Sequence, residues 1–161
     1  MRILNNLRAS IDLWSWLFPL TYLLHIAEEY WGGEGYPAYL LRLRGVYLSP
    51  SRFWLAQSIG VILVIAGIIL SRRLKFYHMM LVILGAAVLV NGVTHTITSA
   101  RHLSYGPGLL TSIFVWIPLG VSTLVRFKTN MSSQRYWLAV IIGTAINGAV
   151  AVITLRGGRL V

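Results

Sequence analysis

Residues 77–100 are YHMMLVILGAAVLVNGVTHTITSA, and this stretch decides the class of fold. It contains no Asp, Glu, Lys or Arg, and its first half is almost entirely apolar. A helix that crosses a bilayer needs about 20 predominantly apolar residues. We therefore interpret 77–100 as a transmembrane helix whose second half is unusually polar.

The rest of the chain repeats this pattern of long apolar runs. Of its 161 residues 57% are hydrophobic and 11% are charged, with a mean hydropathy of +0.71, whereas soluble domains carry roughly 25% charged residues. We predict an all-α fold, a polytopic membrane helix bundle with five transmembrane helices in a single domain over 1–161. The predicted spans are about 12–31, 53–71, 77–100, 109–127 and 136–155.

The segment 37–48 mixes arginine with leucine and tyrosine, which is typical of an interfacial helix lying on a membrane. An ordinary polar connector is the alternative. Small residues on the last span permit a homo-oligomer without requiring one. The chain has no cysteine, which excludes disulfides, thiolate metal sites and cysteine nucleophiles.

The charge is strongly basic, with 14 Lys and Arg against 4 Asp and Glu. The basic residues are scattered between apolar runs, so we expect the lipid bilayer and its anionic headgroups as partners and no nucleic acid. Somewhat more of them fall on the side of the N-terminus than on the other side. By the positive-inside rule, this predicts a multi-pass protein of the cell membrane with a cytoplasmic N-terminus.

The first span ends in LLHIAEEYW (23–31), which places His25, Glu28 and Glu29 at helical spacing inside an apolar run. A charged side chain costs on the order of 3 kcal/mol at a bilayer centre, so these residues need partners. In the third span, Asn91 and His95 share one helical stripe with His102.

Both clusters lie at the C-terminal ends of odd-numbered spans, which run in the same direction. We therefore expect them to meet inside the bundle, where His95, Arg101 and His102 would compensate the two glutamates. The alternative is that the glutamates mark where the first helix leaves the membrane and that His102 is a solvated helix end.

The pentapeptide HIAEE (25–29) resembles the signature of the HXXEE family of prokaryotic multi-pass membrane proteins. The later block HLSYGPGLLTS (102–112), with Asn91 and His95 before it, resembles a second region of that family. The resemblance implies a multi-pass membrane protein. It leaves the reaction open, because the family has no settled activity.

Histidines and a carboxylate suit zinc or a similar divalent metal with one coordination position left for water. The second carboxylate would act as a general base or orient a ligand, and an amide or guanidinium would stabilise negative charge on the substrate. The predicted function is a metal-dependent membrane enzyme, hydrolase-type or acid/base, acting on a lipid-like or amphipathic small molecule. The predicted metal ligands are His25, Glu29, His95 and His102, and the predicted catalytic residues are Glu28, Glu29, Asn91 and Arg101.

Two alternatives dispense with a catalytic metal. In one, His25 and a glutamate move protons on an isoprenoid or sterol-like lipid, as the general plan of the emopamil-binding sterol isomerases suggests by analogy of fold. In the other, the protein binds lipid or ions without catalysis and the cluster is a structural salt-bridge network.

Overall fold

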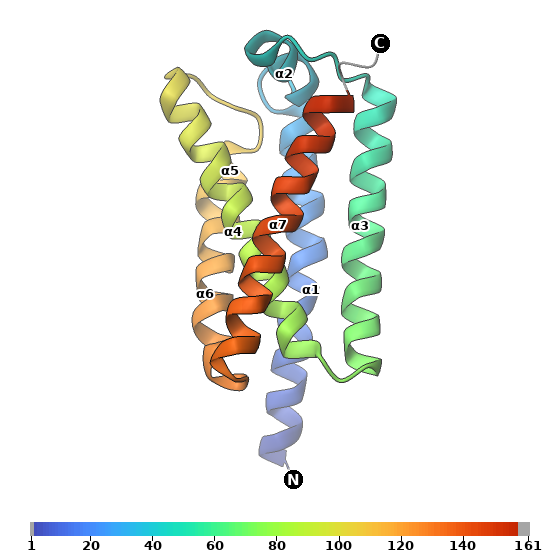
Figure 1. Cartoon of the computed structure of the whole chain (residues 1–161), viewed down its shortest axis with the longest axis vertical. Helices are drawn as coiled ribbons and strands as arrows, with labels where there is room; N and C mark the ends of the chain where they lie inside the picture. The colour runs from blue at the N-terminus through green and yellow to red at the C-terminus, as the bar shows by residue number, and fades with distance from the viewer. Residues whose placement is uncertain (1, 158–161) are drawn as a thin grey trace.

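The computed structural model describes residues 2–157, with the side chains of 13–154 and 156, and within that range it contains helices and no strand. The predicted all-helical class is confirmed. The long helices run roughly side by side along the molecule, and one short helix lies across one end (Figure 1). In chain order the elements are α1 (Arg2–Trp31), α2 (Tyr36–Arg44), α3 (Pro50–Arg73), α4 (Tyr77–His102), α5 (Leu109–Thr111), the π-helical η1 (Ser112–Trp116), α6 (Ile117–Phe127), the 3-10 turn η2 (Lys128–Asn130) and α7 (Ser133–Gly157).

Four described segments, and not five, are long and apolar enough to cross a membrane: Pro50–Arg73, Tyr77–His102, Leu109–Asn130 and Ser133–Thr154. Helix α1 has 30 residues but is not among them. Its sequence places arginines and an aspartate in the first turns and HIAEE near the end, which lowers its hydropathy. The predicted number of spans is corrected accordingly, although α1 still packs against α3, α5 and η1.

Helix α4 forms the centre of the bundle and packs against α6 and α7. Leu81 and Val82 are fully buried there. Gly143 of α7 lies so close to the backbone of α4 that a Cβ at this position would collide with the Ile83 carbonyl. Ala139 is fully buried one turn earlier, as expected from the small residues of the last span.

The helical segment that follows α4 is irregular near Pro118. Proline has no N–H and its ring clashes with the carbonyl four residues earlier, so Pro118 cannot sit in a regular α-helix without a local change. The π-helical η1 precedes it and widens the helix at that point. In this region Thr111, Ser112 and Trp116 are all buried.

Helix α2 covers the end of the bundle at which α1 ends (Figure 1). It is shorter than the predicted 37–48 segment and ends at Arg44. Gly45, with a positive φ of 63°, forms its C-terminal cap. The helix buries Tyr39 and Leu40 against the bundle, while Arg42 forms an exposed ion pair with Glu34 at 2.6 Å.

Candidate metal centre

His25, Glu29 and His95 meet inside the bundle, each offering one ligand atom within 4.8 Å of the others. The Glu29 Oε1 atom lies 3.6 Å from His25 Nε2 and 3.4 Å from His95 Nε2. His25 is 1% exposed and Glu29 is 5% exposed. The predicted meeting of the first span with the polar half of residues 77–100 is confirmed for these three side chains.

Helix periodicity and ring packing hold the two imidazoles in place. His25 and Glu29 are four residues apart and therefore share one face of α1. The Trp116 ring stacks on His25 with a centroid distance of 3.7 Å, and His95 meets His25 edge-on at 5.0 Å. The π-helical turn thus supplies one wall of the cluster.

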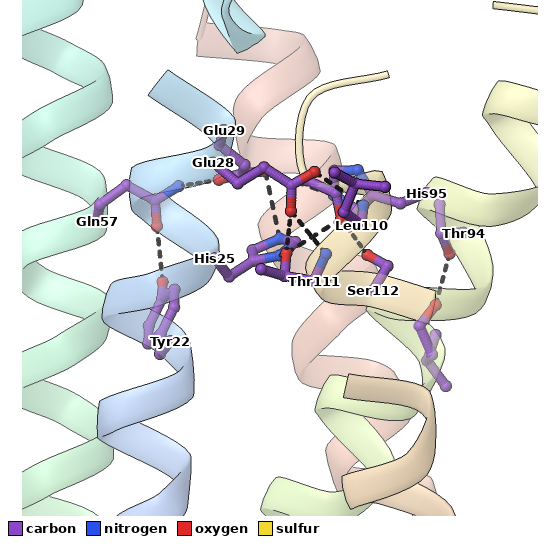
Figure 2. Close-up of polar contacts among 12 residues, drawn as sticks. Tyr22, His25, Glu28, Glu29, Gln57, Thr94, His95, Leu110, Thr111 and Ser112 are labelled. Carbon is purple, nitrogen blue, oxygen red and sulfur yellow. Dashed lines mark hydrogen bonds and ion pairs between the residues drawn. The ribbon is translucent and has the colours of Figure 1, made fainter. Parts of the chain in front are cut away.

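Helix α3 holds Glu29 from the other side (Figure 2). Gln57 donates its side-chain amide to Glu29 Oε2 at 2.8 Å. The Gln57 carbonyl in turn accepts the hydroxyl proton of Tyr22 at 2.8 Å. Because Oε2 is engaged in this way, Oε1 is the atom that Glu29 turns toward the histidines.

Glu28 is adjacent in sequence but has different partners. Its carboxylate accepts the backbone N–H groups of Leu110 at 2.8 Å and Thr111 at 2.7 Å, the Thr111 hydroxyl at 2.5 Å and the Tyr105 hydroxyl at 2.8 Å. The first N–H groups of a helix have no partner within the helix, and this end carries a positive partial charge. Glu28 therefore caps the helical segment that begins at Leu109.

A chain of hydrogen bonds from Glu28 determines the tautomer of His25. A carboxylate only accepts, so the Thr111 hydroxyl donates to Glu28 and accepts from His25 Nδ1, which lies 2.7 Å away. A neutral His25 then carries its proton on Nδ1 and keeps the lone pair on Nε2. The Nε2 atom is buried and has no hydrogen-bond partner among residues 2–157.

The loop between α4 and α5 closes over the cluster. Gly108 has a φ of 87°, and a Cβ there would lie 2.7 Å from His25 Cε1 and 3.1 Å from His95 Cε1. Only glycine lets the backbone pass this close. In the same loop, burial and the hydrogen bond to Glu28 raise the pKa of Tyr105 from 10.0 to about 12, so its hydroxyl remains a donor above pH 10 as well as at neutral pH.

Four of the predicted site residues do not join the cluster: Glu28, whose separate partners are described above, and three residues of α4. Arg101 and His102 are exposed at the end of α4, and His102 is not in the group of ligand atoms found in the described chain. Seven residues beyond His95 correspond to about 10 Å along a helix, so a shared stripe does not bring the two imidazoles to one ion. Asn91 is half-buried, and its Oδ1 has no partner within the described part of the chain.

The compensation expected from Arg101 and His102 comes instead from residues that the sequence did not single out. Thr111 and the backbone at the start of α5 donate hydrogen bonds to Glu28, and Gln57 donates one to Glu29. An isolated glutamine within the apolar run 53–71 was the one visible signal for Gln57. Thr111 lies within the block 102–112 that resembles the HXXEE family, but no feature of that block distinguishes this threonine from its neighbours.

A family model described as a protein of unknown function with an HXXEE motif matches residues 16–123. This chain belongs to the HXXEE family. The match covers about two thirds of the chain and includes every residue of the cluster, with the motif itself at His25–Glu29. Comparison with curated proteins and with solved structures gives no significant match. Membership of the family therefore supports the site but leaves its chemistry to be argued from geometry.

Proposed function

We propose that this HXXEE protein is a membrane-embedded, metal-dependent enzyme that acts on a lipid-like or amphipathic substrate. In this proposal, zinc or a similar divalent cation binds to His25 Nε2, Glu29 Oε1 and His95 Nε2. The observation that supports it best is the convergence of these three atoms, from two helices distant in sequence, at a largely buried point.

The distances within the cluster favour a shared cation over direct hydrogen bonds. The separations of 3.4 and 3.6 Å exceed the roughly 2.7–3.2 Å of N–H···O bonds. Zinc–nitrogen bonds of 2.0–2.1 Å in a tetrahedral site would place ligand atoms about 3.3 Å apart. The two distances from Glu29 Oε1 to the histidine nitrogens lie close to that value, and all three ligand atoms lie within 4.8 Å of one another.

The surroundings of the cluster are those that a metal ligand requires. A histidine that binds a metal usually donates its second N–H to an acceptor, which fixes the ring and the tautomer. His25 makes this contact with Thr111, and Glu29 is oriented by Gln57. Three protein ligands are typical of catalytic zinc sites, where the ion would supply Lewis acidity and a water activated near neutral pH.

The two glutamates take separate parts in this proposal. Glu28 accepts four hydrogen bonds, which leaves its carboxylate poorly suited to remove a proton from a substrate. We assign Glu28 to positioning His25 through Thr111, and Glu29 to the metal. We further propose a substrate of apolar character that would approach from the bilayer of the cell membrane; the exposed leucines and isoleucines of the membrane-length helices support this.

One observation favours a second candidate function. Glu29 Oε1 lies within 4 Å of two imidazole nitrogens, which is also suitable for a metal-free site that moves protons on a lipid double bond. The presence or absence of bound metal distinguishes the two.

Elemental analysis of the full-length protein, purified in detergent without chelators and then reconstituted with Zn²⁺, tests the proposal. We expect about one metal ion per chain in the wild type and in His102→Ala, and loss of the metal in His95→Ala. His102→Ala is the matched control because it removes an exposed histidine from the same helix. A folded wild-type protein that binds no metal would overturn the metal-dependent function.

A further inference from the structure

A cavity that is largely open to the surface lies beside the loop that covers the cluster. It has a volume of about 400 Å³, within the roughly 300–1,000 Å³ of small-molecule pockets. It is formed where the end of α4 meets the loop and the start of the next helical segment. Its walls include Ser99, Leu103, Ser104, Tyr105, Leu109 and Ile113.

The floor of this cavity contains buried hydroxyl groups without partners. Ser99 is 5% exposed, yet neither its Oγ nor that of Ser104 has a hydrogen-bond partner in the described chain. Buried polar groups are nearly always hydrogen-bonded. On the same helix, Thr94 and Thr96 donate to their own backbone at 2.8 Å, so the unpaired state of Ser99 is a local exception.

Another buried hydroxyl without a partner lies near Ser99, on α2 and outside the lining of the cavity. Tyr39 is 6% exposed, and its OH also has no partner among residues 2–157. A Cβ on Gly106 would lie 2.6 Å from Ser99 Oγ and 2.9 Å from Tyr39 OH, so both oxygens lie against this one glycine. Hydroxyls from α2 and α4 therefore converge on the loop.

The rim of the cavity is apolar and unusually exposed. Leu103 is 94% exposed and has a φ of 47°, a left-handed conformation that is strained for leucine. Ile113 continues the same apolar wall and is 38% exposed. A hydrocarbon chain would cover both side chains.

We propose that this cavity is a lipid-binding site that takes a single-chain amphiphile with an uncharged hydroxyl or ester head group. The hydroxyls of Ser99 and Ser104 would hold the head group by donating and accepting hydrogen bonds, and the chain would lie along Leu103 and Ile113. None of the described residues that line the cavity is charged, which disfavours a phosphate head group.

The site is distinct from the metal cluster but shares a wall with it. Within one short loop, Gly106 faces Ser99 and Tyr39, whereas Gly108 faces His25 and His95. The proposal does not depend on bound metal. The two sites can therefore be tested, and can fail, independently.

Photolabelling of the full-length protein in nanodiscs tests the site, with a monoacylglycerol that carries a diazirine on its chain as the probe. We expect cross-links concentrated on 103–113. The double variant Ser99→Ala, Ser104→Ala should lower this labelling about tenfold, because two hydrogen bonds to the head group are lost. Thr94→Ala, which removes an exposed hydroxyl engaged with its own helix, should leave the labelling unchanged.

A second variant fills the cavity and leaves both serines in place. Ala100→Phe introduces a ring at the cavity wall, and we expect it to abolish labelling of 103–113 without changing the metal content. Unchanged labelling in both variants, or cross-links spread evenly over the outward faces of α3 and α7, would overturn the proposal. A phosphate-bearing lysolipid that competes as well as an uncharged one would overturn the assignment of the head group.

Discussion

Glu28 and Glu29 are neighbours in the sequence, yet they face different parts of the molecule. The negative charge of each carboxylate is compensated by a different set of partners. Glu28 meets the N-terminal N–H groups of another helix and two hydroxyls. Glu29 meets two imidazoles and one glutamine amide. Successive helical residues differ by about 100° in direction, so adjacent residues in one turn of α1 contact two different neighbouring helices. In the proposed function, Glu28 therefore has a structural role and Glu29 is a metal ligand.

The largest expected effect separates the two glutamates by metal binding. Glu29→Gln removes a charged ligand, and we expect metal affinity to fall by more than the roughly 100-fold that loss of an outer partner can cost. Competition with a chromophoric chelator in detergent measures this affinity. A Glu29→Gln protein that binds metal as tightly as the wild type would assign the ion to other residues.

Thr111 connects the two glutamates through His25, so its replacement comes next. Thr111→Val keeps the shape of the side chain but removes the hydroxyl that accepts from His25 Nδ1. We expect metal affinity to fall about 10–100-fold, as for other partners of metal-bound histidines.

Thr111→Ser is the matched control, because it restores the hydroxyl, and its affinity should lie near that of the wild type. Equal weakening in Thr111→Ser and Thr111→Val would show that packing, and not the hydrogen bond, is responsible.

Glu28→Gln should act mainly on stability. It removes the negative charge at the start of the helical segment from Leu109 and weakens charge-assisted hydrogen bonds, which we expect to cost about 2 kcal/mol. Thermal unfolding in detergent measures the loss. If Glu28→Gln instead leaves stability unchanged and abolishes metal binding, the two glutamates have exchanged their roles.

The smallest expected effect concerns Tyr105. Tyr105→Phe removes one of the donors to Glu28, and because Tyr105 is 39% exposed we expect a loss below about 1 kcal/mol. The pKa of Tyr105 is raised from 10.0 to about 12, so its stabilisation is complete below pH 10 and is lost as the pH rises toward 12.

Unfolding of the wild type and Tyr105→Phe at several pH values measures this difference. The two proteins should differ at pH 8 and converge at the alkaline end. A difference that grows with pH would contradict the assignment.

Much of this arrangement could be predicted from the chain, and the misses have physical causes. The apolar run at 77–100 gave α4 to within two residues at its C-terminal end, and HIAEE with His95 gave the cluster. His102 was wrongly placed at that cluster. Residues on one stripe of a helix point in the same direction, but His102 lies too far along the helix axis from His95 to share its neighbours. The partners of Glu28 could not be predicted, because they are backbone N–H groups that become available only where another helix begins. By length and composition, four described segments qualify as spans where five were predicted, because the polar residues of HIAEE and the charged residues before them lower the hydropathy of α1.

The central claim is that His25, Glu29 and His95 bind one cation. X-ray absorption at the zinc edge of the full-length protein, reconstituted with one equivalent of Zn²⁺, tests it most directly. We predict scattering from two imidazole rings and at least one oxygen ligand, all at about 2.0–2.1 Å. A spectrum with only oxygen ligands, or with a third imidazole, would contradict the account.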